Sequence, residues 1–189
     1  MADALPQRHG MLDDLAATAR SVPAAALTRL PETAAFVFRG CGSAVERMGA
    51  AFGVAMPRDA CRFAADAGRT AFWLGPDEWL LDAGNEAPET FFAAAQRELG
   101  ALAHSLVDVS HRSMRIAITG SHSAYVLNHG CPLDLSLKAF PVGMCTRTIF
   151  GKATIMLWRP EESAFRLDVW RSFAPYVWQL LDEARSELA

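Results

Sequence analysis

The sequence feature that most constrains the fold is an internal duplication. The pattern Gly-x-x-Ser-Ala occurs at residues 40–44 and again at 120–124, each time between a predicted strand and a predicted helix. Two further similarities recur in the same order: Leu81-Asp82 with Leu167-Asp168, and the turn at 74–78 with that at 158–162. Because the matches follow one order along the chain, we expect two related structural units.

Each unit is expected to contain strands and helices of the βαββα type. Apolar runs bounded by turn residues indicate strands, and apolar residues at helical spacing indicate helices. The predicted strands are 35–39, 63–65, 70–74, 78–82, 105–109, 112–118, 145–149, 153–158 and 165–170, and the predicted helices are 44–52, one beginning at Pro88, 122–129, and one that occupies the C-terminal residues. A single unit would leave one face of its sheet uncovered, whereas two units can cover each other. The sequence therefore predicts an α+β pseudo-dimer with mixed, largely antiparallel sheets.

The expected organisation is an N-terminal arm over 1–33, a first lobe over 34–104 and a second lobe over 105–189, with both lobes in one compact unit. The arm is rich in alanine and is interrupted by three prolines. Such a segment is either loosely held or becomes ordered on a partner.

Composition excludes several classes of protein. Apolar residues make up 51% of the chain and charged residues 21%, which excludes a disordered polymer. The net charge of −3 predicts no nucleic-acid partner. The longest run without charge, 116–133, contains glycine, asparagine and proline, so no membrane segment is expected. Four cysteines without a C-x-x-C pair indicate reduced thiols and a cytoplasmic location.

Motifs for common catalytic chemistry are absent from the sequence. His122, His129 and Cys131 lie close together, but the second ligand pair typical of zinc sites is lacking. Cys131 also follows a predicted helix rather than beginning one, which argues against a reactive thiolate. The glycines at 40–42 lack the third glycine of a dinucleotide-binding loop. We therefore predict no catalytic and no metal-binding residues.

The polar stretch 108–112 supplies the candidate cofactor-binding residues Asp108, His111 and Arg112. It lies between two predicted strands. Asp108 is placed to orient His111 or to pair with Arg112 or Arg115. The alternative is a purely structural hydrogen-bonded crossover between the strands.

Trp170, Arg171 and Trp178 are the candidate interface residues. Trp178 lies off the predicted apolar stripe of the last helix, and Trp170 and Arg171 stand where the last strand meets that helix. Tryptophan and arginine are enriched in protein interfaces. The alternative for Trp178 is burial under another part of the same chain.

Several stretches, taken together, resemble the gamma subunit family of heterotetrameric sarcosine oxidase. They cover roughly residues 70–180 in the order of that family. The stretches are 73–81 (WLGPDEWLL), 107–112 (VDVSHR), 130–135 (GCPLDL), 140–143 (FPVG), 147–148 (RT) and 171–176 (RSFAxY).

This resemblance implies an accessory, non-catalytic subunit that works by assembly with alpha, beta and delta subunits. The complex implied by the resemblance demethylates sarcosine oxidatively to glycine, releases hydrogen peroxide and forms methylenetetrahydrofolate when tetrahydrofolate is present. The resemblance places FAD, FMN, NAD and tetrahydrofolate mainly on the alpha and beta subunits and zinc on delta, so no cofactor is expected in this chain.

A more distant resemblance is to the folate-binding aminomethyltransferases of glycine cleavage. The sequence Asp108-Val109-Ser110-His111 is similar to an early motif of that family, and Phe165-Arg166-Leu167 to a later strand. Counting back along that strand places the paired aspartates of the family on Ala153-Thr154. The resemblance therefore supports the fold and argues against the activity.

Two alternatives to an accessory subunit remain open from the sequence. A stand-alone folate-binding or one-carbon transfer protein would need a replacement acid, for which Asp108 is the best candidate. A homo-oligomer would bury the exposed interface by self-association of the isolated chain.

Overall fold

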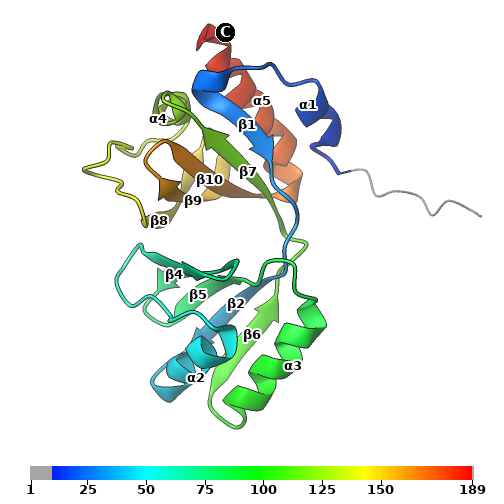
Figure 1. The fold of residues 1–189 in the computed structure, drawn as a ribbon, viewed down its shortest axis with the longest axis vertical. Coiled ribbons are helices and arrows are strands. Elements are labelled where there is room, and N and C mark those ends of the chain that lie inside the picture. The colour runs from blue at the N-terminus through cyan, green and yellow to red at the C-terminus, as the bar shows by residue number, and fades with distance from the viewer. Residues whose placement is uncertain (1–9, 189) are drawn as a thin grey trace, which may run out of the picture.

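The chain forms two lobes, each a five-stranded antiparallel sheet with helices on one face (Figure 1). The computed structural model describes residues 10–188. The first lobe contains β2 (Ala35–Gly40), α2 (Ser43–Phe52), β3 (Phe63–Asp66), β4 (Arg69–Gly75), β5 (Glu78–Asp82), α3 (Pro88–Leu99) and β6 (His104–Asp108). The second lobe contains β1 (Ala26–Arg29), β7 (Ser113–Thr119), α4 (Ser123–Asn128), β8 (Cys145–Phe150), β9 (Ala153–Glu161), β10 (Ala164–Trp170) and α5 (Ala174–Ala184).

Shorter helical segments flank these elements. Helix α1 (Asp13–Ala17) and the 3-10 turn η1 (Pro23–Ala25) precede β1, and the 3-10 turns η2 (Arg171–Phe173) and η3 (Arg185–Leu188) flank α5.

The duplication is visible in the strand order of the two sheets. The orders are β3-β4-β5-β2-β6 and β8-β9-β10-β7-β1, so each strand of one sheet has a counterpart in the other. All strand pairs named in the two sheets are antiparallel. The predicted α+β class is therefore confirmed, while the expected mixture of strand directions is not found. Each lobe also has three strands between its helices, one more than the βαββα pattern.

The edge strands β1 and β6 are exchanged between the lobes. Strand β1 precedes the first lobe in the chain but pairs with β7 of the second, with Leu27 opposite Ile118. Strand β6 precedes β7 but pairs with β2 of the first lobe, with Val107 opposite Val37. Chain order alone predicts that 105–109 belongs to the second lobe. Sheet pairing is non-local, and it places this strand in the first lobe.

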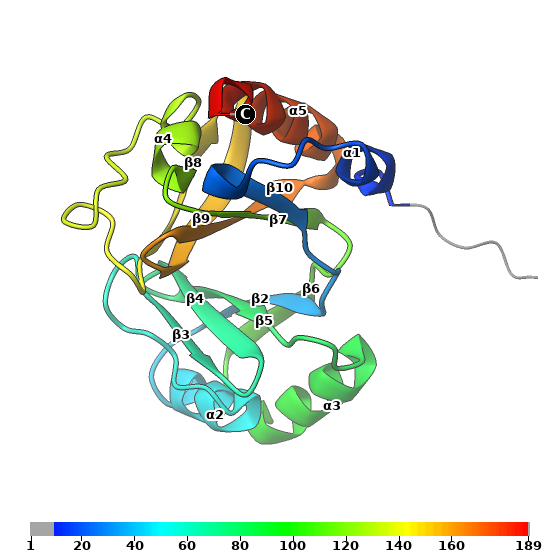
Figure 2. The same cartoon turned by 45° about the horizontal axis from the view of Figure 1, so that its top comes forward.

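The two sheets face each other, and the larger helices cover their outer faces, which gives four layers (Figure 2). Each lobe has its own apolar core between sheet and helices. A third, smaller cluster joins the sheets, and its buried members are Phe72, Leu80, Cys145, Met156 and Trp158. Four successive residues of β5 are buried, because both faces of this strand are covered.

Part of the predicted N-terminal arm lies against the second lobe. Leu12 and Ala25 belong to the apolar core of that lobe. Nη1 of the buried Arg185 donates to the Ala25 carbonyl at 3.2 Å. The rest of the arm, residues 1–9, lies outside the described residues.

Candidate functional site

A buried cluster of charged side chains joins the two lobes. Arg115 on β7 binds Asp168 of its own sheet through Nε at 2.8 Å and Asp82 of the other lobe through Nη1 at 2.5 Å. The guanidinium also lies over the Trp158 ring, 5.2 Å from its centroid. Asp82 and Asp168 are the repeated aspartates of the internal duplication. One arginine therefore binds the duplicated acidic residue of both lobes.

The electrostatics of this cluster follow from its burial. Burial opposes the positive charge of Arg115, but the charges of Asp168 and Asp82 outweigh it and raise the pKa of the guanidinium. Burial raises the pKa of the Asp168 carboxyl, and the charge of Asp82 acts in the same direction against the opposing effect of Arg115. One guanidinium thus binds two carboxylates, an arrangement that holds elements together rather than one that activates a substrate.

A small cleft lies between the lobes next to this cluster. Its apolar side includes Leu74 and Leu80 of the first lobe and Met156 of the second. Its polar side includes Arg112 and Arg147. The cavity volume is about 80 Å³. Pockets for cofactor-sized ligands usually measure about 300–1,000 Å³, so this cavity is too small for a folate.

The structure places Asp108 in a local turn. Its Oδ1 accepts hydrogen bonds from the Ser110 amide at 2.9 Å and the Ser110 hydroxyl at 2.6 Å. The Ser110 hydroxyl oxygen also accepts a hydrogen bond from the Ala35 amide at 3.0 Å. The hydrogen bonds of Asp108 are therefore to Ser110 and not to His111, Arg112 or Arg115, which corresponds to the structural crossover of the sequence analysis.

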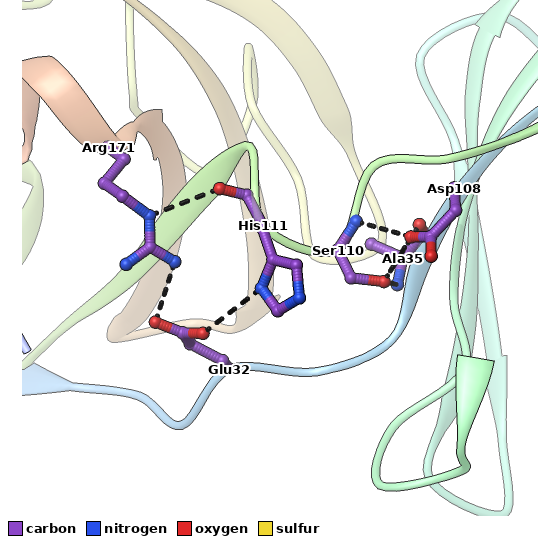
Figure 3. Close-up of polar contacts among 6 residues, drawn as sticks. All are labelled: Glu32, Ala35, Asp108, Ser110, His111 and Arg171. Atoms are coloured by element: carbon purple, nitrogen blue, oxygen red, sulfur yellow. Dashed lines mark hydrogen bonds and ion pairs between the residues drawn. The ribbon is translucent and has the colours of Figure 1, made fainter. Parts of the chain in front are cut away.

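His111 belongs to a second part of the same crossover (Figure 3). Its Nδ1 lies 3.8 Å from Glu32 Oε2, and Arg171 binds the other Glu32 oxygen at 2.8 Å. Arg171 Nε also donates to the His111 carbonyl at 3.2 Å. These contacts hold together the two segments in which the chain passes from one lobe to the other, at 30–34 and 109–112. His111 therefore has a structural environment, and its side chain is largely exposed.

Trp178 is buried, which corrects its assignment as an interface residue. Only 2% of its surface is exposed, and it packs in the core of the second lobe. The buried face of α5 consists of Ala174, Val177, Trp178, Leu181 and Ala184. Helical spacing in the sequence predicts a stripe through Phe173, Tyr176, Val177, Leu180, Leu181, Ala184 and Leu188. Phe173 and Tyr176 are instead exposed. Because this helix is apolar on most sides, helical spacing alone allowed a stripe displaced from the true one.

The other two interface candidates lie at the surface. Trp170 is 55% exposed and lines the cleft. Arg171 is partly exposed and is bound to Glu32. The structure thus brings Trp170 and Arg112 to one cleft.

The positions that correspond to the aminomethyltransferase aspartates carry no acid. Ala153 is buried in the second core, and Thr154 is an exposed residue that lines the cleft. Residues 10–188 contain no group of three histidine, cysteine or acidic side chains placed to hold a metal ion. Within the same range, no helix combines the length and apolar character needed to cross a membrane.

The Arg115 cluster is not apparent from the sequence. Arg115 was considered as a partner for Asp108, which is near in sequence, whereas its partners are Asp82 and Asp168. The feature of the sequence that points to this cluster is the duplicated Leu-Asp pair. Two pseudo-symmetric acids on facing sheets need a shared cation if both are buried.

Proteins with similar sequences share one name. Sarcosine oxidase subunit gamma of Corynebacterium sp. (strain U-96) is 33% identical over 143 residues, which cover 75% of this chain and 69% of that protein. Sarcosine oxidase subunit gamma of Arthrobacter sp is 30% identical over 145 residues, which cover 75% and 70% respectively.

Solved structures show the same similarity in three dimensions. A chain of the heterotetrameric sarcosine oxidase from Corynebacterium sp. U-96, solved in complex with pyrrole 2-carboxylate, matches with a TM-score of 0.88 at 27% identity over 97% of both chains. Glycine cleavage system aminomethyltransferase T from Bartonella henselae matches with a TM-score of 0.61 at 16% identity, over 83% of this chain and 45% of that one. The second similarity concerns the fold alone and confirms the aminomethyltransferase-like architecture.

A family model gives the assignment directly. The model described as the sarcosine oxidase, gamma subunit family matches residues 41–187. This range begins after β1 and β2 and includes the rest of both sheets, the Arg115 cluster and the crossover at 109–112. Together with relatives of 30% identity or more, it confirms the resemblance found in the sequence: the chain belongs to the sarcosine oxidase gamma subunit family.

Proposed function

We propose that this chain is the accessory, non-catalytic gamma subunit of a heterotetrameric sarcosine oxidase. In this role it binds the alpha, beta and delta subunits, which carry the FAD, FMN, NAD, tetrahydrofolate and zinc of the complex. The complex oxidises sarcosine to glycine and hydrogen peroxide and forms methylenetetrahydrofolate. The observation that carries the proposal is the match over 97% of both chains to a chain of the Corynebacterium heterotetramer.

The local chemistry of the chain supports a structural role. Arg115, Asp82 and Asp168 are buried polar groups that are bound to one another and join the lobes. The Asp108 turn and the Glu32 contacts likewise hold the crossovers. Side chains engaged in this way stabilise a shape that other subunits can bind, and a standard interface buries about 800 Å² on each partner.

Co-expression with the alpha, beta and delta chains tests the proposal. We expect this chain to co-purify with them in equal amounts. We expect sarcosine-dependent hydrogen peroxide formation from the complex and none from the isolated chain. A chain that stays separate from all three subunits, or that oxidises sarcosine alone, would contradict the proposal.

A stand-alone folate-binding protein is the second candidate, and the aminomethyltransferase-like fold is the observation that favours it. The alanine at position 153, where the aminomethyltransferases carry an acid, opposes it. Titrating the isolated chain with tetrahydrofolate while following tryptophan fluorescence separates the two functions. We expect no saturable binding at micromolar concentrations, and saturation there would favour the second candidate.

A further inference from the structure

The mouth of the inter-lobe cleft combines exposed cationic and aromatic side chains. Arg112 from the crossover, Arg147 on β8, Thr154 on β9 and Trp170 on β10 all line the cleft and are exposed. Arginine and tryptophan are the residue types that most often dominate the energy of protein interfaces. The mouth therefore has the composition of a binding surface.

Arg112 is the cation of this cleft whose charge is not balanced. Arg147 binds Glu78 at 3.0 Å, and Arg115 binds Asp82 and Asp168. By contrast, no hydrogen bond or ion pair to another of residues 10–188 engages the Arg112 guanidinium. Its backbone is fixed all the same, because its amide donates to the Val109 carbonyl and its carbonyl accepts from the Arg171 amide.

The surroundings of Arg112 disfavour its positive charge. Partial burial lowers the pKa of the Arg112 guanidinium, and the charge of Arg147 lowers it further. Asp168 and Glu78 oppose this effect without overcoming it. Both of these carboxylates are already bound by other arginines. An additional carboxylate at the mouth would therefore meet a guanidinium that has no carboxylate bound to it among residues 10–188.

The size of the cleft limits what can enter it. Its volume of about 80 Å³ compares with the roughly 10–15 Å³ of cavity space that is needed to hold one water molecule. A carboxylate head group of a side chain fits such a space, and a cofactor does not. The apolar surface of Trp170 beside it, 55% exposed, offers a contact for the neighbouring part of the same segment.

We propose that the mouth of this cleft receives an aspartate or glutamate side chain from another subunit of the complex. The carboxylate binds Arg112 and approaches Arg147, while an adjoining apolar part of the same segment packs on Trp170. This inference rests on the proposed function, because it supposes that the chain assembles with other subunits. Beyond the proposed function, it specifies which surface of the chain binds another subunit and which side chain of that subunit binds there.

The test uses the co-expressed four-subunit complex. The dissociation constant between this chain and the other three subunits is measured for the wild type and for Arg112→Gln, Arg112→Lys and Trp170→Ala. The control is Arg97→Gln, which removes the same charge from an exposed position on α3 in the first lobe. Thermal unfolding of each variant establishes that it is folded.

We expect Arg112→Gln to weaken assembly about tenfold or more, because losing one partner of a close interfacial charge pair is costly. Arg112→Lys retains the charge and should restore part of the affinity, whereas Arg97→Gln should match the wild type. Trp170→Ala should also weaken assembly. It keeps the test decisive if Arg112→Gln does not fold.

Three results would overturn the inference. If Arg112→Gln and Trp170→Ala assemble as tightly as the wild type and Arg97→Gln, the docking site is wrong while the proposed function stands. If inorganic phosphate saturates the isolated chain in an Arg112-dependent manner and assembly is unaffected, the cleft is a small-anion site. If Arg112→Gln abolishes only self-association of the isolated chain, the occupant is a second copy. Failure of the wild type to assemble would instead contradict the proposed function.

Discussion

The two lobes share one topology, but the interior of each lobe is stabilised by different interactions. In the first lobe, aromatic rings dominate the contacts: Phe36 packs on Phe91 with centroids 4.7 Å apart, and Phe52 packs on the same ring at 5.5 Å. In the second lobe, buried guanidinium groups bind backbone carbonyls of segments that are distant in sequence. The duplicated framework thus tolerates two ways of filling its interior.

Two arginines of the second lobe show this clearly. Arg159 is 4% exposed, and its Nη1 donates to the carbonyls of Leu135 and Phe140 at 3.0 and 2.9 Å. It thereby anchors the long connection between α4 and β8. Arg185 binds the carbonyl of Ala25 in the N-terminal segment. Carbonyl groups in loops need donors when they are buried, and a long arginine side chain supplies several at once.

The lobe-joining cluster should give the largest effect on stability. Arg115→Met leaves Asp82 and Asp168 buried without their cation, and we expect a loss of about 3–5 kcal/mol in the free energy of unfolding at pH 7. Urea denaturation measures it. The control is Arg39→Met, which breaks the exposed ion pair with Asp77 and should cost less than about 1 kcal/mol.

The pH dependence of this variant provides a second check. Burial raises the pKa of Asp168 above its usual value, so the folded state takes up a proton more readily than the unfolded chain. A raised carboxyl pKa penalises folding above that pKa, and the penalty disappears as the pH falls below it. The deficit of Arg115→Met relative to the wild type should therefore shrink as the pH is lowered toward 4. A deficit that grows in acid would show that the two aspartates are not the cause.

A smaller loss of stability should distinguish the buried arginines of the second lobe from the partly exposed arginine of the first lobe. Arg159→Met removes the donors for the Leu135 and Phe140 carbonyls, and we expect a loss of about 2–3 kcal/mol. In the first lobe, Arg69 similarly binds the Phe52 carbonyl and Glu86, each at 2.7 Å, but its side chain is 29% exposed. Arg69→Met should cost about 1 kcal/mol. Equal losses in denaturant unfolding would remove the distinction between the lobes.

The smallest expected difference is in the order in which parts of the structure unfold, and cysteine labelling in urea measures it. Burial, and then the nearby Cys61, raise the pKa of Cys145 to about 12, so its thiol should not react with iodoacetamide at pH 8. The exposed Cys41 should react under the same conditions. Cys145 lies in the small cluster between the sheets, and Cys131 lies in the core of the second lobe. We therefore expect rising urea to expose Cys145 first. Mass spectrometry measures the labelling of each cysteine. If Cys145 and Cys131 become labelled at the same urea concentration, the molecule unfolds as a single cooperative unit.

Local patterns predicted much of the fold. The strands 70–74 and 78–82 with their Gly-Pro-Asp turn correspond to β4 and β5, and the helix expected from Pro88 begins there. The strand β1 was missed, because its short sequence is stabilised by pairing with the distant β7. Sequence order likewise could not reveal the exchange of β6.

The candidate site was predicted only in part. The stretch 108–112 was correctly located between two strands, and its contacts are those of a structural crossover. Trp178 was misplaced because a largely apolar helix has no unique stripe. The charge cluster escaped because its members are brought together by the facing sheets and not by local sequence.

The exchange of β1 and β6 has a consequence for the ancestry of the molecule. Each half of the polypeptide carries one strand that completes the sheet of the other half. This is the arrangement that results when two copies of a one-lobe ancestor, paired by swapping their arms, become fused into one gene. A cut between α3 and β6 would recreate that ancestral pair: two fragments, each lacking one strand of its own sheet, that regain a full structure by complementing each other.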